Sequence, residues 1–160
     1  MSSIVLIDTS VFLNVLNIAG YTQHRKSILD QFAQHIIQND WLFLPTATIW
    51  ETGNHIAKIR DGNVRRECAK WFIQEVSKAL VGEKPYTVTE FPAREEFQSW
   101  LVTFPDTVIR TSAKRGNGEG TSLSDHSIIK EWEKLCKRHR MSRVLIWSLD
   151  ADLIAYDRHP

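Results

Sequence analysis

Three observations in the sequence predict one α/β domain with a parallel central sheet. Three short runs of consecutive apolar residues, far apart in the chain, are typical of strands buried on both faces. The segments between them repeat apolar residues at helical spacing, and no linker or internal repeat divides the chain. A length of 160 residues with 42% hydrophobic residues suits a single domain with one sizeable core.

The three apolar runs read SIVLI, WLFL and RVLIW and cover residues 3–7, 41–44 and 143–147. Each is as long as an ordinary strand, and Pro45 ends the second run because proline cannot donate to a sheet. Residues 86–89 are a fourth and weaker candidate. We therefore expect strands at these positions, with helices crossing between them.

Helices are expected where apolar residues recur every three or four positions. Their expected ranges are 11–17, 23–38, 46–60, 64–80, 93–102 and, after a cap at Thr121 or Ser122, about 123–137. The buried stripe expected for the fourth of these helices is Cys68, Trp71, Phe72, Val76 and Leu80. All six tryptophans are expected in the core, with Trp50 the one most open to stacking on a base.

Composition excludes several classes of protein. The net charge is only +1, so the overall charge does not indicate a nucleic-acid partner. Binding of nucleic acid would need local basic patches or a metal. Cys68 and Cys136 are the only cysteines and lie far apart, which excludes a structural zinc site and predicts reduced thiols. No signal peptide or membrane-spanning stretch is recognisable, so a cytoplasmic protein without membrane contact is expected.

Four acidic residues stand where a parallel sheet could gather them. Asp8 and Asp150 follow the first and last apolar runs, and ligands of parallel α/β sheets bind at the carboxyl ends of the strands. Glu51 and Asp125 lie early in two expected helices, where favourable interaction with the helix dipole is an alternative explanation. The set of four, rather than any one of them, indicates a functional site.

Oxygen ligands of this kind favour Mg²⁺ or Mn²⁺, which take carboxylates and keep several waters, and they suit zinc poorly. Such a metal lowers the pKa of bound water and neutralises phosphate oxygens, which is the chemistry of phosphodiester hydrolysis. A phosphatase of the haloacid-dehalogenase kind would need a second aspartate two residues after Asp8, where Ser10 stands. A receiver-type signalling domain would leave Glu51 and Asp125 without roles.

Four segments, in order, resemble the motifs of PIN-domain nucleases. IVLID followed by TSVFLNVL resembles the first motif, and PTATIWETGNHI, with Glu51 in the helix after the second strand, resembles the second. TSLSDHSIIKEW leads into Asp125 as the third motif does, and LIWSLDADLIAY places Ser148 two residues before Asp150 as in the fourth. The resemblance covers nearly the whole chain and implies one domain over residues 1–160 with three layers, a central parallel sheet flanked by helices.

The resemblance also implies roles for individual residues. The metal ligands and catalytic residues would be Asp8, Glu51, Asp125 and Asp150, with Ser10 and Ser148 orienting carboxylates by hydrogen bonds. The implied activity is cleavage of single-stranded RNA with Mg²⁺ or Mn²⁺. Many bacterial members are VapC-type toxins, so an antitoxin protein and a homodimer are implied as partners. The alternative is a catalytically silent PIN-like module that binds RNA or protein.

Some features depart from the family pattern or leave alternatives open. Asp152 is a second candidate for the fourth acid, either contacting the metal or lying on the solvated side of a helical turn. Residues 64–104 are longer than a minimal VapC-type toxin needs and are a candidate helical elaboration. Family members usually continue into another short strand, whereas this sequence ends at Pro160, so a truncated sheet edge is expected.

Lys114 and Arg115 are the basic residues of most interest for RNA binding. They lie in the glycine-rich loop over residues 111–122, directly before the expected helix of Asp125. We expect the basic residues of this loop to bind RNA phosphate groups beside the metal. His55, four residues after Glu51, would share its helical face, whereas His126 would point away from the site because adjacent helical residues do not face the same way.

Overall fold

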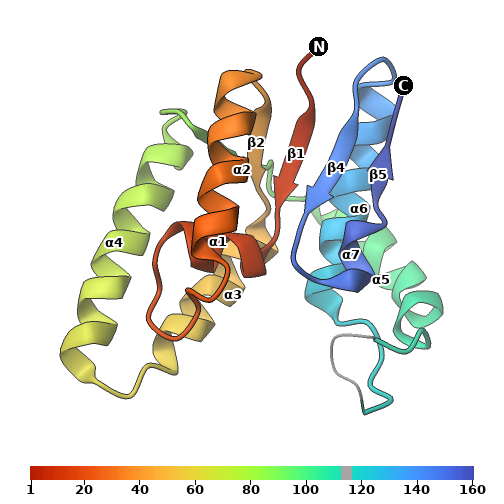
Figure 1. The fold of residues 1–160 in the computed structure, drawn as a ribbon. Coiled ribbons are helices and arrows are strands. Elements are labelled where there is room, and N and C mark those ends of the chain that lie inside the picture. Colours follow the sequence, from red (N-terminus) through yellow and green to blue (C-terminus); the bar gives the residue numbers. More distant parts are fainter. Residues whose placement is uncertain (113–116) are drawn as a thin grey trace.

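The computed structural model describes residues 1–112 and 117–160 (Figure 1). Its strands are β1 (Ile4–Ile7), β2 (Trp41–Leu44), β3 (Tyr86–Val88), β4 (Val144–Trp147) and β5 (Asp157–Arg158). Its helices are α1 (Thr9–Val15), α2 (Arg25–Ile37), α3 (Thr46–Ala57), α4 (Gly62–Leu80), α5 (Arg94–Val108), α6 (Leu123–Arg138) and α7 (Ala151–Ile154). None of the helices in these two ranges has the length and apolar content needed to cross a membrane.

The strands form one sheet in the order β3-β2-β1-β4-β5. β1 pairs in parallel with β2 on one side and β4 on the other, and β3 continues the parallel pairing beyond β2. Ile7 lies opposite Trp147, so β1 and β4 end side by side. The residues that follow these two strands, including Asp8 and Ser148, therefore emerge at one edge of the sheet.

Helices cover both faces of the sheet, because the side chains of β1 alternate between two cores. Val5 and Ile7 belong to a core with α1, α2, α3 and α4, whereas Ile4 and Leu6 belong to a second core with α6 and α7. Figure 1 shows α2 and α4 on one side of the sheet and α5, α6 and α7 on the other. The predicted three-layer α/β/α architecture is confirmed, and the unbroken apolar run of β1 is explained by burial on both faces.

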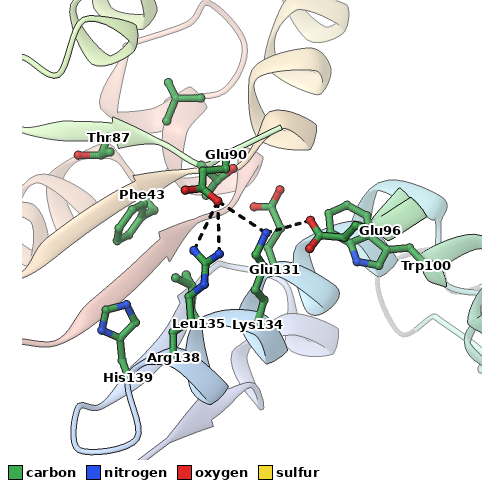
Figure 2. Close-up of a pocket in the computed structure, with 12 residues that line it drawn as sticks. Phe43, Thr87, Glu90, Glu96, Trp100, Glu131, Lys134, Leu135, Arg138 and His139 are labelled. Atoms are coloured by element: carbon green, nitrogen blue, oxygen red, sulfur yellow. Dashed lines mark hydrogen bonds and ion pairs between the residues drawn. The ribbon is translucent and has the colours of Figure 1, made fainter. Parts of the chain in front are cut away.

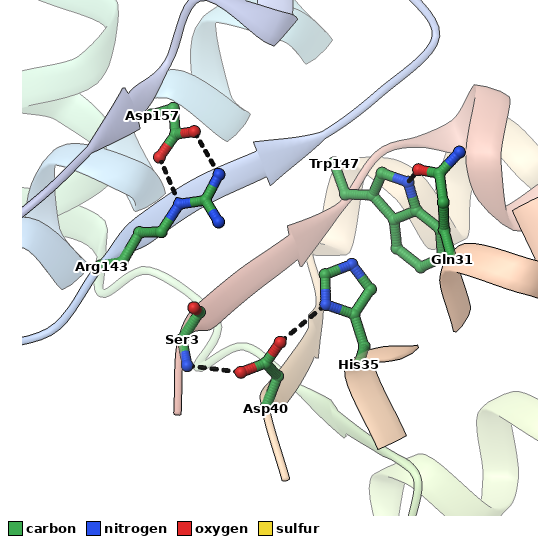
Figure 3. A network of polar contacts seen from close by, with 7 residues as sticks. All are labelled: Ser3, Gln31, His35, Asp40, Arg143, Trp147 and Asp157. Atoms are coloured by element: carbon green, nitrogen blue, oxygen red, sulfur yellow. Dashed lines mark hydrogen bonds and ion pairs between the residues drawn. The ribbon is translucent and has the colours of Figure 1, made fainter. Parts of the chain in front are cut away.

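The edge of the sheet at β4 differs from expectation. The chain reaches a fifth strand, β5, which pairs antiparallel with β4, so the prediction of a truncated edge is wrong and the sheet is mostly rather than wholly parallel. Arg143 holds this strand through two hydrogen bonds to Asp157, of 2.9 Å from Nε and 2.6 Å from Nη2 (Figure 3). A two-residue strand held by an ion pair carries no apolar run, which is why the sequence did not indicate it.

A polar network ties the start of the sheet to α2, as Figure 3 shows. Asp40 accepts hydrogen bonds from the Ser3 backbone and from His35 Nδ1, the latter at 2.7 Å. The His35 ring packs against Trp147 with centroids 4.7 Å apart, and the Trp147 indole donates to Gln31. These contacts join α2 to Trp147 of β4 and to the residues directly before β1 and β2.

The long helix α4 is far more exposed than its periodicity predicts. Trp71 is 47% exposed and Leu80 is 56% exposed, so their placement in a buried stripe is wrong, and Val76 and Ala79 are the buried residues of this helix. Cys68 and Phe72 are partly buried against the core. Periodicity identifies the apolar face of a helix, but it cannot say whether the same chain covers that face.

Other expectations about helices and tryptophans also need correction. Trp41 and Trp50 join Trp71 among the exposed side chains, whereas Trp100 and Trp147 are buried and Trp132 is partly buried. α5 continues through Pro105 to Val108, beyond the expected end at residue 102. α7 is the helical turn that was one of the alternatives for Asp152, and a single turn is too short to show a periodic pattern in the sequence.

One carboxyl group is buried in the layer of α5 and α6. Glu131 is only 6% exposed, and burial raises the pKa of its carboxyl group to about 7. A hydrogen bond with Thr89 and the charge of Lys134 oppose this rise, while the charge of Glu96 adds to it. Glu131 is therefore a buried acid that is partly protonated at neutral pH.

The raised pKa of Glu131 makes stability depend on pH. Folding favours the protonated carboxyl, so its stabilising contribution is complete below the unfolded value of about 4.5 and is lost as pH rises through about 7. We expect the Glu131→Gln protein to gain up to roughly 3 kcal/mol in unfolding free energy relative to the unsubstituted protein between pH 4.5 and 7. Urea denaturation across this range measures the difference.

Glu133→Gln provides the control for this experiment. Glu133 lies on the same helix with a side chain 40% exposed, so its substitution removes a carboxylate that folding leaves partly exposed. If the difference for Glu131→Gln grew no more between pH 4.5 and 7 than the difference for Glu133→Gln, Glu131 would not have the raised pKa.

Candidate active site

Asp8 is the most firmly held of the predicted site residues. It follows β1, caps the N-terminus of α1 in an extended conformation and is 1% exposed. Its Oδ2 accepts hydrogen bonds of 2.7 Å from both Ser10 Oγ and Ser148 Oγ. Its other oxygen, Oδ1, is buried and makes no hydrogen bond within the described part of the chain. Such an oxygen is a ready acceptor for a cation or donor.

The two serines connect Asp8 to the turn that follows β4. Ser10 Oγ accepts from the Leu149 backbone N–H at 3.0 Å, and Ser148 Oγ accepts from the Asp150 backbone N–H at 2.9 Å. Each hydroxyl thus accepts from the turn and donates its single proton to Asp8. The β1 and β4 ends are joined by side chains as well as by the sheet.

Asp150 caps the short helix α7 in the same way that Asp8 caps α1. It is buried, and its Oδ1 accepts from the Asp152 backbone N–H at 3.0 Å. The shared contact with Ser148 places Asp150 next to Asp8. Asp152 turns to a different neighbour, because its Oδ2 accepts from Ser112 Oγ at 2.7 Å.

Glu51 reaches the same edge from α3. The buried Thr48 hydroxyl donates to the Ile7 carbonyl at 2.7 Å, which fastens α3 to the end of β1. Glu51 follows on this helix, and its Oε2 accepts from Thr9 Oγ1 at 3.1 Å. Since Thr9 is adjacent to Asp8 in the chain, Glu51 is held beside the Asp8 position.

Asp125 lies in the first turn of α6, the helix that precedes β4. Ser122 caps this helix by accepting from the Asp125 N–H at 3.1 Å, and the Asp125 residue is 1% exposed. α6 runs antiparallel to β1 and β4, so it begins at the edge where those strands end (Figure 1). The helix also packs against β1 and α3. All four predicted acids are therefore delivered to one edge of the sheet.

The acids nevertheless do not form a ready-made metal cage. Among the described residues, no group of three or more His, Cys, Asp or Glu side chains lies in position to hold a metal ion. Hydroxyl groups connect some of them, with Ser148 between Asp8 and Asp150 and Thr9 bound to Glu51. The donor set remains one of hard oxygen atoms, which suits Mg²⁺ or Mn²⁺ chemically.

A pocket of about 240 Å³ opens beside Glu51. Its walls include Thr9, Ser10 and Leu149. Tyr21 and His55 also line it, with the Tyr21 hydroxyl oxygen 2.9 Å from His55 Nδ1. His55 does share a face with Glu51, as its spacing predicted. His126 points into the protein instead, where its Nε2 lies 2.8 Å from the Trp100 carbonyl.

The predicted RNA-binding residues Lys114 and Arg115 lie outside the described residues. The base of their loop is described, and Thr111 and Gly120 form a bridge there. Gly120 is required at that point, because a Cβ would stand 1.8 Å from the Val108 carbonyl oxygen. The Ser112 contact with Asp152 joins the base of the loop to α7.

Sequence reasoning missed the threonines that position the acids. Thr48 bonds the β1 end and Thr9 bonds Glu51, yet a threonine early in a helix is ordinarily explained as a neutral or capping residue. One signal was available: Thr48 stands three residues before Glu51, which places both on neighbouring positions of one helical face.

Comparison with known proteins supports the fold. No family model and no curated protein matches the sequence. The crystal structure of FitAcB from Neisseria gonorrhoeae is similar with a TM-score of 0.58 and 14% identity, over 95% of this chain and 91% of that one. The structure of FitAB bound to an IR36 DNA fragment has a TM-score of 0.55 and 16% identity, over 95% and 89%. These similarities confirm the predicted PIN-like fold.

The hydroxyl contacts of Asp8 can be tested by substitution. Ser148→Ala removes a donor from a buried carboxylate and an acceptor from the Asp150 N–H, and should lower the unfolding free energy by about 1–3 kcal/mol. In an Asp8→Asn background the loss should be smaller, because the charged acceptor is gone. Chemical denaturation of the four proteins measures both values.

Ser99→Ala serves as the control for this cycle. Ser99 is exposed, and within the described residues its hydroxyl bonds its own helix at the Glu96 carbonyl, so its loss should matter little and should be independent of Asp8. An identical cost for Ser148→Ala in both backgrounds would contradict the proposed coupling between Ser148 and Asp8.

Proposed function

We propose that this protein is a divalent-metal-dependent endoribonuclease that cleaves single-stranded RNA. The observation that carries the proposal is the state of Asp8: one carboxylate oxygen is saturated by two serines, and the other is buried and without a hydrogen bond among the described residues. A buried carboxylate oxygen in that position calls for a cation or a hydrogen-bond donor. It stands at the sheet edge to which Glu51, Asp125 and Asp150 are also delivered.

These four acids are the groups that would hold Mg²⁺ or Mn²⁺, with Asp152 the alternative to Asp150. The metal, when bound, would supply a water of lowered pKa and neutralise charge on the scissile phosphate. The serines have a separate task, which is to hold Asp8 in one orientation by donating to its Oδ2. Thr9 does the same for Glu51 at Oε2.

Burial of the carboxylates suits this chemistry. Asp8, Asp125 and Asp150 are all nearly inaccessible to solvent, so water would screen their electrostatic effect on a bound phosphate ester only weakly. The four acids come from four separate elements, and three of them stand at the first turn or cap of a helix. Rigid elements of this kind hold charged groups in fixed positions.

The comparisons suggest the biological setting of the activity. Both similar structures are of Fit proteins, FitAcB from Neisseria gonorrhoeae and FitAB bound to a DNA fragment. By analogy we propose that this chain acts as the toxin of a toxin-antitoxin pair, binds a small antitoxin protein and forms a homodimer. The exposed apolar residues of α4, among them Trp71 and Ile73, are compatible with such contacts.

A second function remains in competition, a silent PIN-like module that binds RNA or protein. One observation favours it: within the described residues, the acidic side chains are not grouped as a set of three or more ligands. The two functions differ in their response to metal, because only a protein that binds the ion in its folded state is stabilised by it.

The first experiment is cleavage of a mixed-sequence, single-stranded RNA with Mn²⁺, Mg²⁺ or EDTA. We expect cleavage with either metal, none with EDTA, and a fall of roughly 100-fold or more in Asp8→Asn, which keeps the shape of the side chain but removes its charge. Asp106→Asn, at an exposed position of α5, is the matched control and should leave the rate unchanged.

Thermal denaturation with and without Mn²⁺ completes this test. Stabilisation that is present in the unsubstituted protein and absent from Asp8→Asn would support a metal site even if the RNA chosen were a poor substrate. The absence of both cleavage and Mn²⁺ stabilisation would reject the nuclease in favour of the silent module.

The proposed role of Lys114 and Arg115 predicts a change in salt dependence. If both side chains contact phosphates, replacing both with Ala should weaken RNA binding and reduce the slope of log affinity against log salt by about 1.4. Replacing Lys137 and Arg140, two exposed basic residues at the far end of α6, is the control. An unchanged slope in the Lys114 and Arg115 variant, measured by fluorescence anisotropy, would refute the role.

A further inference from the structure

A second pocket, of about 260 Å³, lies away from the candidate active site. It opens between the β2–β3 edge of the sheet and the helices α5 and α6 (Figure 2). None of the predicted catalytic or metal-binding residues lines it. Glu131, which does, comes six residues after Asp125 on α6, roughly 9 Å further along the helix.

The pocket has apolar walls and an acidic group within them. Phe43, Trp100 and Leu135 supply much of the apolar lining. Glu131 lies among them and is only 6% exposed. Its Oε2 is inaccessible to solvent and has no hydrogen-bond partner in the part of the chain that the structure describes. An unpaired carboxylate oxygen at this depth is costly unless a proton or a cationic partner satisfies it.

The basic residues around the pocket are already committed to other carboxylates. Lys134 Nζ lies 2.9 Å from Glu96 and 3.8 Å from Glu90, and Arg138 Nη2 lies 3.4 Å from Glu90. Figure 2 shows these ion pairs meeting at the rim, beside Glu131. With Glu131 ionised, the pocket has three carboxylates against two cations, so one negative charge is left without a counterion.

We propose that this pocket binds a small organic cation, an alkylammonium group whose charged end pairs with Glu131 and whose carbon chain packs against Phe43 and Trp100. An ammonium group would donate to the Glu131 carboxylate from the pocket side, and it would restore neutrality to the pocket. The indole of Trp100 adds an aromatic surface next to the cation. An anion would meet the unpaired charge of Glu131 and is disfavoured.

Binding of such a cation requires an ionised Glu131, which ties affinity to pH. Burial raises the pKa of Glu131 to about 7, so the ionised fraction rises about tenfold between pH 6 and pH 8. The other charged or titratable groups lining the pocket are Glu90, Glu96, Lys134, Arg138 and His139. The two strands contribute only Phe43, Thr87 and Val88 to the lining, none of which titrates.

The test uses n-butylammonium as the probe and n-butanol as its uncharged counterpart. In an NMR titration of the full chain, followed at the Trp100 indole, the affinity for n-butylammonium should rise about tenfold from pH 6 to pH 8. The affinity for n-butanol should be weaker at pH 8 and independent of pH. Comparing the two ligands separates ion pairing from burial of the carbon chain.

Two variants complete the design. Glu131→Gln should reduce n-butylammonium affinity at pH 8 by about tenfold or more, because a buried pair loses its charge, whereas Glu133→Gln should leave it unchanged. The pH series on the unsubstituted protein stands even if Glu131→Gln folds poorly.

The proposal is overturned by any of three results: no binding of n-butylammonium, equal affinity at pH 6 and pH 8, or full affinity in a folded Glu131→Gln protein. It does not depend on the nuclease proposal, since Asp8→Asn should bind n-butylammonium as the unsubstituted protein does.

Discussion

The parallel pairing of β1 with β4 is the constraint on which the candidate site depends. These strands are neighbours although Asp8 and Ser148, which follow them, are 140 positions apart in the chain. Their register sets Ile7 opposite Trp147, and the hydroxyls of Ser10 and Ser148 then meet at one carboxylate oxygen. A shift of one residue would turn the side chains to the opposite face and dismantle the arrangement. At the other end of β1, Asp40 accepts a hydrogen bond from the Ser3 backbone and thereby joins the start of β1 to the start of β2.

α6 links the sheet to both polar regions of the molecule. Its buried residues Ile128 and Ile129 pack on the second core, which fixes the helix relative to β1 and β4. At its first turn the same helix carries Asp125, and further along it carries Glu131. One amphipathic helix therefore delivers a carboxylate to the strand ends and a second one to the pocket beside β3. The packing of its apolar face is what holds both acids in position.

The sequence predicted the parts of the structure that depend on local pattern. Apolar runs located the three central strands, and an acid within three residues of the end of two of them indicated the sheet edge where Asp8 and Asp150 lie. Features made by contacts between distant residues could not be predicted in this way. β5 depends on the pairing of Arg143 with Asp157. Trp71 is exposed because no described element packs over it on α4. The Thr9 contact with Glu51 likewise spans 42 positions, and no local pattern marks it.

The hydroxyl arrangement around Asp8 also restricts how that carboxylate can be used. Both serine protons point at Oδ2, and the serine oxygens are occupied in turn by the N–H groups of Leu149 and Asp150. Neither hydroxyl can turn away without breaking two hydrogen bonds. Among the described residues only Oδ1 makes no hydrogen bond, so a cation bound by Asp8 would meet one of its oxygens rather than both.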